Sequence, residues 1–600
     1  MIRDTLLSNL RPCAFGLLAG LPAGIAACSL ALDLDDKIAC SADADCLYTL
    51  GPGTCEDGFC VPPGSASATD GSSSGEPTTS ATTLTTSATD PTTTSPDSSG
   101  SESSTTGTVG CTLNSECETD QFCGAGGSCT DLLTPECQII HWPGDAPTDR
   151  DNVVFIGSIM PTGEPFTNLV QPLENAVQLA VDDFNDTTTL QGDRHIAWIG
   201  CNDAAGPTAS EAAATHLVDT VGVPAIVGPI FSEAVLDVAN DISVPGGAFL
   251  ITPTATAMSI ASLDDQDLVW RTIPGDVYQS NALVDRMIDL DAISPVSNLL
   301  VLAKDDAYGN GILAAILDDL TMSLPMAAIY TDTYPDPTTF ATQDELLAAY
   351  GAVLAQAATD EAAMPYYTHV LFIGTSEIQV LLYSFLGVVW DGAGGDPMPL
   401  FTVTHGAVPE LERFIDEIGP QTGTAALVPL KPLIESRLQG TSPVVLNPVN
   451  FDAFSIRYRI AFNDEEPLSS SALSYDATLA TLFAMCTVAA DADVTGAAIA
   501  AAMPKLVDPD GEFISFSGSD LSFIGDARNA LATEGGSVDL QGVSGELQWD
   551  LATGDVRADV WGWDVLDMSG DGSMPNAAPT RIYLLDAEPA TDGTWMPIPG

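Results

Sequence analysis

Apolar and polar residues follow two patterns that alternate from about residue 150 onward. Short continuous apolar runs, such as NVVFIGSIM (152–160) and GAFLIT (247–252), have the length and composition of buried strands. Between them lie longer segments, such as residues 168–185, in which apolar positions recur every three or four residues. In that segment the positions are Val170, Leu173, Val177, Val181 and Phe184. Continuous apolar strands alternating with amphipathic helices predict parallel sheets covered by helices on both faces.

The alternation continues through NLLVLAK (298–304), HVLFIG (369–374) and PLFTVT (399–404). This α/β stretch has roughly 440 residues, which exceeds the size at which a single hydrophobic core keeps growing. We therefore expect an α/β fold class with two doubly wound parallel-sheet lobes within residues 138–600. The first lobe is expected at about 150–275 and 431–545, and the second at about 276–430 and 546–590.

The first 28 residues have the composition of an export signal. Two arginines precede the apolar stretch 13–27, which is shorter than the roughly 20 residues that span a bilayer. The sequence IAAC (25–28) resembles the lipobox of bacterial lipoproteins, which implies a signal peptide over 1–27 and lipid on Cys28. The alternative is a plain secretory signal with an incidental cysteine. The lipidated chain would be held in the cell envelope, on the periplasmic face, the outer membrane or the cell surface.

Two four-cysteine modules, 28–63 and 111–137, flank a polar segment. Their cysteines are Cys40, Cys46, Cys55 and Cys60 in the first, and Cys111, Cys117, Cys123 and Cys129 in the second. Neither cluster has a CxxC pair or a nearby His, so two disulfides per module are favoured over zinc, with the pairing left open. Residues 64–110 are almost wholly Ser, Thr, Gly, Pro and acid, which predicts a solvated tether.

The charge balance limits the partners of this chain. Its 82 acidic and 17 basic side chains give a net charge of −65, which would repel nucleic acid and anionic membrane surfaces. No nucleophile elbow, zinc-protease motif or phosphate-binding loop is present, so the sequence does not predict an enzyme. Residues 567–578 begin like a calcium loop but place Ala578 where a bidentate Glu is needed, and no metal or cofactor is expected.

Hydroxyl-bearing residues gather where the predicted strands end. The segments GPIFSE (228–233), TPTATA (252–257) and KDDAYGNG (304–311) each follow an apolar run. In open α/β sheets, ligands bind outside the carboxyl ends of the strands, where helix N-termini also offer free N–H groups. A single Ser or Thr at such a position can serve only as a helix cap. The gathering of several at one edge predicts a cleft for a small polar molecule.

Several segments together resemble the type I periplasmic binding proteins, in the leucine/isoleucine/valine-binding branch. These are residues 225–257, WRTIPGDVYQSNALVD (270–285), VLAKDDAYGNG (301–311) and SYDATLATLFA (474–484). The segment SGELQWDLATGDV (544–556) is similar to the penultimate hairpin of that family, and the resemblance extends over about residues 152–567. It implies two lobes, joined by three crossover strands, that close on a small ligand, commonly an amino acid.

The resemblance also implies ligand-binding residues. Ser232, Thr254 and Thr256 match positions that hold a ligand carboxylate, and Tyr308 matches a residue that closes from the second lobe. His405 falls where the family has an acidic partner for an ammonium group, and Ser376 of GTSE completes the predicted set. A neutral His accepts one hydrogen bond from an ammonium, whereas a protonated His repels it. An amino acid, a small acid, an amide and a peptide fragment all stay open as ligands, and a purely structural His405 stays open too.

Cys137, Cys201 and Cys486 remain outside the two four-cysteine clusters, the signal and the proposed lipid site. The family's disulfide beneath the first-lobe site has its positions at Ala205 and Phe231 here, so it is missing. Cys137 precedes the first strand and Cys201 ends the second, and neighbouring strands would bring them together, which predicts a Cys137–Cys201 bridge. Cys486 has apolar neighbours and is predicted to be a buried free thiol.

Two functions follow from these features. The first is an envelope-anchored solute-binding protein that captures a small polar ligand as the receptor component of an ABC-type uptake system, with an ABC permease or an envelope receptor as partner. The alternative keeps the fold but acts as a ligand sensor or a regulatory lipoprotein. The two cysteine modules favour this alternative somewhat, because a simple transport receptor needs no such stalk.

Overall fold

The computed structural model describes residues 110–598 with short gaps, together with ten strand residues between 47 and 61. The gaps are residues 145, 164–166, 205–207, 341, 362–365, 376, 391–396, 405–435, 444–445, 518–520, 568–574 and 587–591. The predicted signal peptide, Cys28, the tether, Ser376 and His405 therefore lie outside the described residues. In the described part of the chain, no helix is long and apolar enough to cross a membrane.

The chain divides into two compact units, residues 1–108 and 109–600. In the first unit, β1 (Leu47–Tyr48) pairs antiparallel with β2 (Gly51–Pro52), and β3 (Thr54–Glu56) pairs antiparallel with β4 (Phe59–Val61).

The second unit begins with the second cysteine module. It contains η3 (Asn114–Glu116) and the antiparallel pair of β5 (Gln121–Cys123) and β6 (Cys129–Asp131). The disulfides Cys111–Cys123 and Cys117–Cys129 confirm the prediction of two crosslinks and select one of the open pairings. Phe122 and Leu132 are buried in one cluster with side chains of the first lobe, so the module is packed onto that lobe.

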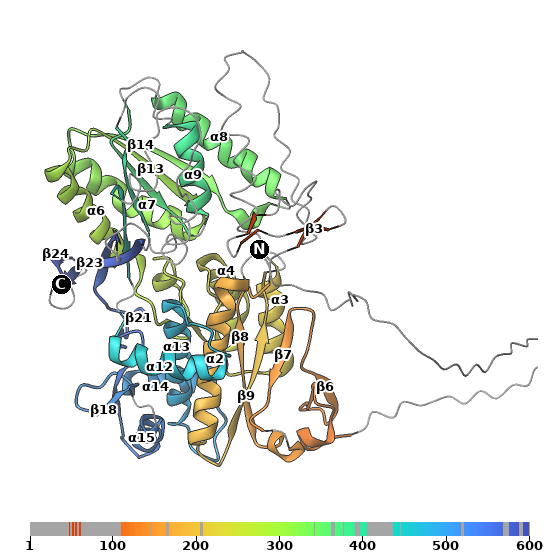
Figure 1. Cartoon of the computed structure of the whole chain (residues 1–600). Coiled ribbons are helices and arrows are strands. Elements are labelled where there is room, and N and C mark those ends of the chain that lie inside the picture. Colours follow the sequence, from red (N-terminus) through yellow and green to blue (C-terminus); the bar gives the residue numbers. More distant parts are fainter. Residues whose placement is uncertain are drawn as a thin grey trace, which may run out of the picture. The chain divides into compact units, whose positions relative to one another are not determined.

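The first lobe is built on a six-stranded sheet in the order β12-β11-β10-β8-β9-β7 (Figure 1). Its strands are β7 (Cys137–His141), β8 (Val153–Ile159), β9 (His195–Cys201), β10 (Ala225–Val227), β11 (Phe249–Thr252) and β12 (Val269–Arg271). All neighbours are parallel except β7, which runs antiparallel to β9 and brings Cys137 opposite Cys201. The predicted Cys137–Cys201 disulfide is confirmed.

Helices from both ends of the unit cover this sheet. The first group is α2 (Thr167–Thr187), α3 (Ala209–Thr215), η5 (His216–Val221), α4 (Ser232–Val238), η6 (Ala239–Ser243), α5 (Val244–Gly246) and η7 (Ile260–Ser262). The second group is α12 (Pro448–Ala461), α13 (Ser469–Met485), α14 (Gly496–Ala502), η10 (Met503–Lys505) and α15 (Ser522–Leu531), with the parallel strands β18 (Glu512–Ser515) and β19 (Val538–Gln541). Helix α13 packs along α2 and buries its side chains from Ser471 to Met485, so segments about 300 residues apart share one core (Figure 1). All five apolar positions predicted on one face of α2 are buried, and Cys486 is a buried free thiol.

The second lobe has an eight-stranded sheet in the order β14-β13-β15-β16-β17-β22-β23-β24. Its strands are β13 (Asn298–Asp305), β14 (Ala328–Pro335), β15 (His369–Ile373), β16 (Leu400–Val403), β17 (Leu438–Ser442), β22 (Val560–Asp567), β23 (Pro575–Leu585) and β24 (Gly593–Pro597). The first five are parallel and the last three antiparallel. Helices α6 (Asp276–Ile293) and α7 (Ala307–Ser323) share a core with one face of β13, while α8 (Gln343–Glu361) and α9 (Ile378–Val388) share a core with the other; η8 (Pro337–Thr339) is a single turn.

Along the described helices and strands, the chain passes between the lobes three times, after β12, after β17 and after β21. The hairpin of β20 (Trp549–Asp550) and β21 (Asp555–Val556) has the place that the resemblance implied, and both Trp549 and Val556 lie in the first-lobe core. Strand β17 lies in the second-lobe sheet. The second and third crossings thus fall later along the chain than the boundaries expected at 431 and 546.

Candidate ligand-binding site

Two hydroxyl-rich loops, residues 228–233 and 252–257, lie at the carboxyl edge of the first-lobe sheet and are joined by hydrogen bonds. Thr252 Oγ1 donates to the carbonyl of Pro229 at 2.6 Å, and Thr254 Oγ1 donates to the carbonyl of Ile230 at 2.9 Å. In the other direction, the N–H of Ala257 donates to Ser232 Oγ at 3.2 Å. The strands β10 and β11 therefore end in hydroxyls partly because those groups join neighbouring loops.

Gly228 allows the first of these loops to turn tightly. Its φ is +99°, and a Cβ atom there would lie 2.3 Å from the carbonyl oxygen of Ile159 on β8. Only glycine fits such a close backbone approach at that φ. The turn directs the chain from β10 into α4 and sets Phe231 and Ser232 at the sheet edge.

In the second lobe, α7 starts against the end of β13. Asp306 caps the helix, because its Oδ1 accepts the N–H of Gly309 at 2.8 Å. A Cβ on Gly309 would lie 2.1 Å from the carbonyl oxygen of Lys304, so the first turn of α7 lies directly on β13. Tyr308 is thereby buried at the carboxyl end of the second sheet.

The two sheet edges meet at these loops. The ammonium of Lys304 lies 5.6 Å from the ring centroid of Phe231, across the boundary between the lobes. Burial, followed by the charge of Asp237, raises the pKa of Glu233, and a hydrogen bond from the Ala307 N–H on α7 opposes this rise. The backbone N–H of Asp276, at the start of α6, donates to the carbonyl of Thr256 at 2.8 Å. The predicted residues from the two lobes are therefore brought to one place.

Asp276 is buried there without a partner. It has no exposed surface, and neither carboxylate oxygen has a hydrogen bond of acceptable geometry in the described structure. Burial raises its pKa to about 7; the hydroxyl of Thr256 and the charge of Arg271 lower the pKa, and Asp306 and Asp555 raise it. Arg271 itself pairs with Asp555 and leaves its Nη2 without a hydrogen bond.

The hydroxyl of Tyr308 is also unsatisfied. It is buried and has no hydrogen-bond partner of acceptable geometry among the described residues. The nearby Thr404 is already engaged, because its Oγ1 donates to the carbonyl of Gly374 at 3.0 Å and accepts that residue's N–H at 3.1 Å. Burial, followed by the charge of Asp276, raises the pKa of Tyr308, so the phenol stays neutral at physiological pH.

The ammonium of Lys304, near Tyr308, is paired with two carboxylates. It is 4% exposed, and its Nζ lies 2.9 Å from Asp306 Oδ2 and 2.8 Å from Asp336 Oδ2. Burial alone lowers its pKa, but the carboxylates of Glu377, Asp306 and Asp336 outweigh burial and raise the pKa, so the group stays charged. Glu377 accepts hydrogen bonds from Tyr334 and Thr375.

The structure thus describes some of the predicted binding residues and leaves others out. Ser232, Thr254, Thr256 and Tyr308 gather at the meeting of the two sheets, while Ser376 and His405 lie outside the described residues. Ser158, another hydroxyl at a strand end, is fully buried and accepts the indole N–H of Trp198 at 3.0 Å, which is a structural role. Sequence reasoning gave no role to Arg271, Asp276 or Lys304. Their charge in otherwise apolar or neutral segments was the available signal.

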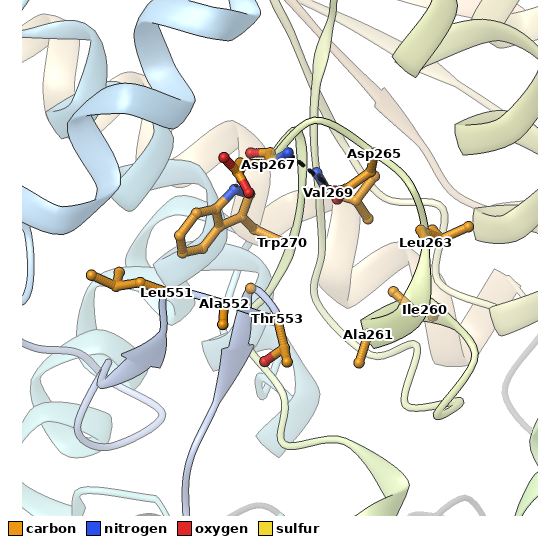
Figure 2. Close-up of a pocket in the computed structure, with 11 residues that line it drawn as sticks. Ile260, Ala261, Leu263, Asp265, Asp267, Val269, Trp270, Leu551, Ala552 and Thr553 are labelled. Atoms are coloured by element: carbon orange, nitrogen blue, oxygen red, sulfur yellow. Dashed lines mark hydrogen bonds between the residues drawn. The ribbon is translucent and has the colours of Figure 1, made fainter.

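A pocket lies within the first lobe, between residues 260–270 and the turn 551–554 of the β20–β21 hairpin (Figure 2). Asp265 faces it, but its oxygens accept the N–H groups of Asp267 at 3.1 Å and Val269 at 2.8 Å. The indole of Trp270 donates to the carbonyl of Asp267 at 2.7 Å. The polar atoms of this loop satisfy one another, so the pocket offers little to a ligand.

Among the residues that the structure describes, metal-ligand side chains do not assemble at the meeting of the lobes. Over the described ranges, the single cluster of three such residues is Cys111, Cys117 and Cys129, and all three are in disulfides. What the site offers instead is hydroxyls, one unpaired carboxyl and one free phenol, groups that suit the recognition of a small polar molecule.

Comparison with known proteins finds one matching family model and several similar structures. Residues 153–416 match the family model described as periplasmic binding protein. A possible leucine/isoleucine/valine-binding protein from Rhodopirellula baltica SH 1 has a similar structure, with a TM-score of 0.50, 13% identity, and coverage of 71% of this chain and 96% of that chain. No curated protein sequence matches.

Two further solved structures are similar. A leucine-binding protein from Thermotoga maritima MSB8 has a TM-score of 0.49 and 17% identity, covering 71% of this chain and 97% of that chain. A solute-binding protein of an ABC transporter from Rhodopseudomonas palustris BisB5, in complex with 3,4-dihydroxybenzoic acid, has a TM-score of 0.47 and 16% identity, covering 72% and 97%.

Proposed function

We propose that this protein captures a small polar solute between its two lobes, as a protein whose residues 153–416 match the periplasmic binding protein family model. Ser232, Thr254 and Thr256 would bind from the first lobe and Tyr308 from the second. The protein would act without catalysis, outside the cytoplasm, on a lipid anchor at Cys28. An ABC permease would then receive the solute from the closed form.

One observation carries the proposal. Two buried polar groups of the second lobe, the Asp276 carboxyl at the start of α6 and the Tyr308 hydroxyl at the start of α7, have no hydrogen-bond partner among the described residues at the place where the two sheet edges meet. A buried polar atom without a hydrogen bond costs about 1–3 kcal/mol, so native proteins rarely keep several together without a reason. A bound solute supplies the missing partners.

The three crossings provide the mechanism. Lobes joined by a few extended segments can rotate about them, which is the hinge closure of ligand-binding proteins. The contacts of Phe231 with Lys304 and of Glu233 with α7 bring the lobes together on one side of the site. A solute touching both lobes would favour this closed arrangement.

The direct test measures binding to the purified protein. Thermal shift against amino acids, small acids and amides should show stabilisation that grows with ligand concentration, as mass action requires. Calorimetry should then show a loss of about 1–3 kcal/mol in binding free energy for Thr256→Ala and for Ser232→Ala. Thr321→Ala, at an exposed position of α7, is the matched control and should bind normally. Equal affinity in all three variants would remove both residues from the site.

A second candidate function is sensing or regulation without transport. It is favoured by the second cysteine module, which is packed onto the first lobe through Phe122 and Leu132 and adds a fixed surface beside it. A gene deletion distinguishes the transport function from the sensing function. Deleting the gene should abolish uptake of the identified solute if the protein is a transport receptor, and should leave uptake intact if it is a sensor.

A further inference from the structure

Helix α12 carries three large apolar side chains on its outer face. Val449 is 67% exposed, Ile456 is 61% exposed and Ile460 is 79% exposed. Their spacing along the chain places them in one line on the helix, and together they form the α12 stripe. The opposite face, with Phe454 and Tyr458, is buried in the first-lobe core, where α12 lies against α2 (Figure 1). The helix is therefore held on the lobe without the stripe.

Local folding does not explain the α12 stripe. Val and Ile lose side-chain freedom in a helix, so at exposed helical positions they stabilise the helix less than Ala, Glu or Lys would. Exposed apolar side chains of monomeric proteins commonly occur singly, whereas contiguous ones mark interaction surfaces. The stripe is therefore expected to contact another molecule.

Two opposite charges border the stripe on one side. Asp452 and Arg459 are both exposed, and the two turns of helix between them place them on the same side of the stripe. Arg459 Nη1 lies 3.3 Å from Glu466 Oε1, and these side chains are 47% and 70% exposed. Such an exposed ion pair contributes little, so Arg459 is available to another carboxylate.

The order of these side chains along α12 is self-complementary. We propose that a second copy of this chain covers the α12 stripe, with the two α12 helices antiparallel across a two-fold axis. The proposal does not depend on solute binding, because the stripe lies outside the site between the lobes. An isologous interface of this kind requires that each residue meet its own partner residue twice, once from each copy.

A single position of the axis satisfies both the charges and the apolar side chains. An axis midway between Asp452 and Arg459 places each Asp452 beside Arg459 of the second copy. The same axis passes next to Ile456, so the two Ile456 side chains meet across it. With a rise of about 1.5 Å per residue, Val449 then lies within about 3 Å, measured along the helix, of Ile460 of the second copy. All three apolar side chains are covered, and two ion pairs form.

The proposed dimer is expected to be weak and reversible. An interface of one helix from each copy is smaller than the roughly 1,200 Å² of a standard interface. The net charge of −65 also makes two copies repel each other. At about 0.15 M salt this repulsion is screened beyond about 8 Å, which leaves the contacts between the two helices to decide association. A covalent trap at that salt concentration is therefore the suitable assay.

The first test introduces one cysteine at a time into the full chain. After oxidation with copper phenanthroline in air, Ile456→Cys should give a covalent dimer on a non-reducing gel, well above the parent chain. Its position next to the axis brings the two backbones within the roughly 4.4–6.8 Å that a disulfide spans. Val449→Cys and Ile460→Cys are the matched controls, because each lies about 20 Å and about 14 Å along the helix from its own counterpart.

The controls also make a positive prediction. Val449→Cys and Ile460→Cys should each give little dimer alone, and a mixture of the two chains should give a dimer, because these positions meet across the axis. Equal yields from all three single variants would indicate random collision and would overturn the proposal. Absence of dimer with Ile456→Cys would overturn it as well, and would assign the stripe to a different protein partner.

The second test reverses the two charges in the chain that carries Ile456→Cys. Either Asp452→Arg or Arg459→Asp alone places like charges opposite each other and should lower the dimer yield about fivefold. Both changes together restore opposite charges across the axis and should restore the yield. A general effect on the stability of α12 would not be rescued by the second substitution. Equal yields in all four chains would contradict the antiparallel pairing.

Discussion

Replacing both Cys137 and Cys201 by alanine tests how the second cysteine module is held on the first lobe. The disulfide joins β7 to the end of β9 and closes a loop with a sequence separation of 64 residues. Crosslinks of this span restrict the unfolded chain, and the loop-entropy relation gives about 4 kcal/mol. Cys137 and Cys201 are both buried, and alanine avoids placing hydroxyls in that core.

The expected result is a loss of about 4 kcal/mol in the unfolding free energy of the first lobe. Urea denaturation can be followed by tryptophan fluorescence, to which Trp198, buried in the core on β9, contributes together with the other seven tryptophans. The matched control replaces Cys117 and Cys129, whose separation is 12 residues and which lie within the module. That control should loosen the module and change the first-lobe transition less.

A loss below about 1 kcal/mol in the Cys137/Cys201 variant would refute this reasoning. It would mean that Phe122, Leu132 and the ladder of β7 with β9 hold the module without the crosslink. A fragment beginning at residue 138 lacks Cys137, Phe122 and Leu132, so it should be less stable than one beginning at residue 109.

Three other changes test the core and the site. Phe184→Ala, in the fully buried face of α2, should lower the unfolding free energy by about 3–5 kcal/mol in urea denaturation. Burial raises the pKa of Glu174 to about 7, so ionising this carboxyl destabilises the folded state progressively between about pH 4.5 and 7. Glu174→Gln should therefore be more stable than the parent by about 3 kcal/mol at pH 8 and equal to it near pH 4. The exposed Asp186→Asn is the control. Gly228→Ala should cost roughly 1–3 kcal/mol from backbone strain, measured by thermal unfolding, and should weaken solute binding because the loop positions Ser232.

Much of the fold could be predicted because it depends on local patterns. The five apolar positions on α2 are buried as their spacing predicts, and the apolar runs at β8, β11, β13 and β15 are strands of parallel sheets. The bridge between Cys137 and Cys201 followed from the neighbouring strands that carry them. The exact crossings were less predictable, since β17 is short and its place in the second sheet depends on pairing with β16 and β22.

The candidate site was predictable only in part. The strand ends that carry Ser232, Thr254, Thr256 and Tyr308 could be read from the chain, because a strand's carboxyl end is a local property. Whether Thr254 is free or already donates to Ile230 depends on a residue 24 positions away. No local pattern contains that information.

The sequence by itself determined that the chain is acidic, that it carries two four-cysteine modules, and that its later part has an α/β fold. These properties depend on composition and on the spacing of apolar residues within a few positions of one another. Only the tertiary structure decided which charges are satisfied. Lys304 meets Asp336 across two parallel strands, and Arg271 meets Asp555 from a segment 284 residues later, which leaves Asp276 alone. Burial and ion pairing are set by how segments far apart in the sequence pack against one another, and no local pattern of residues contains that information.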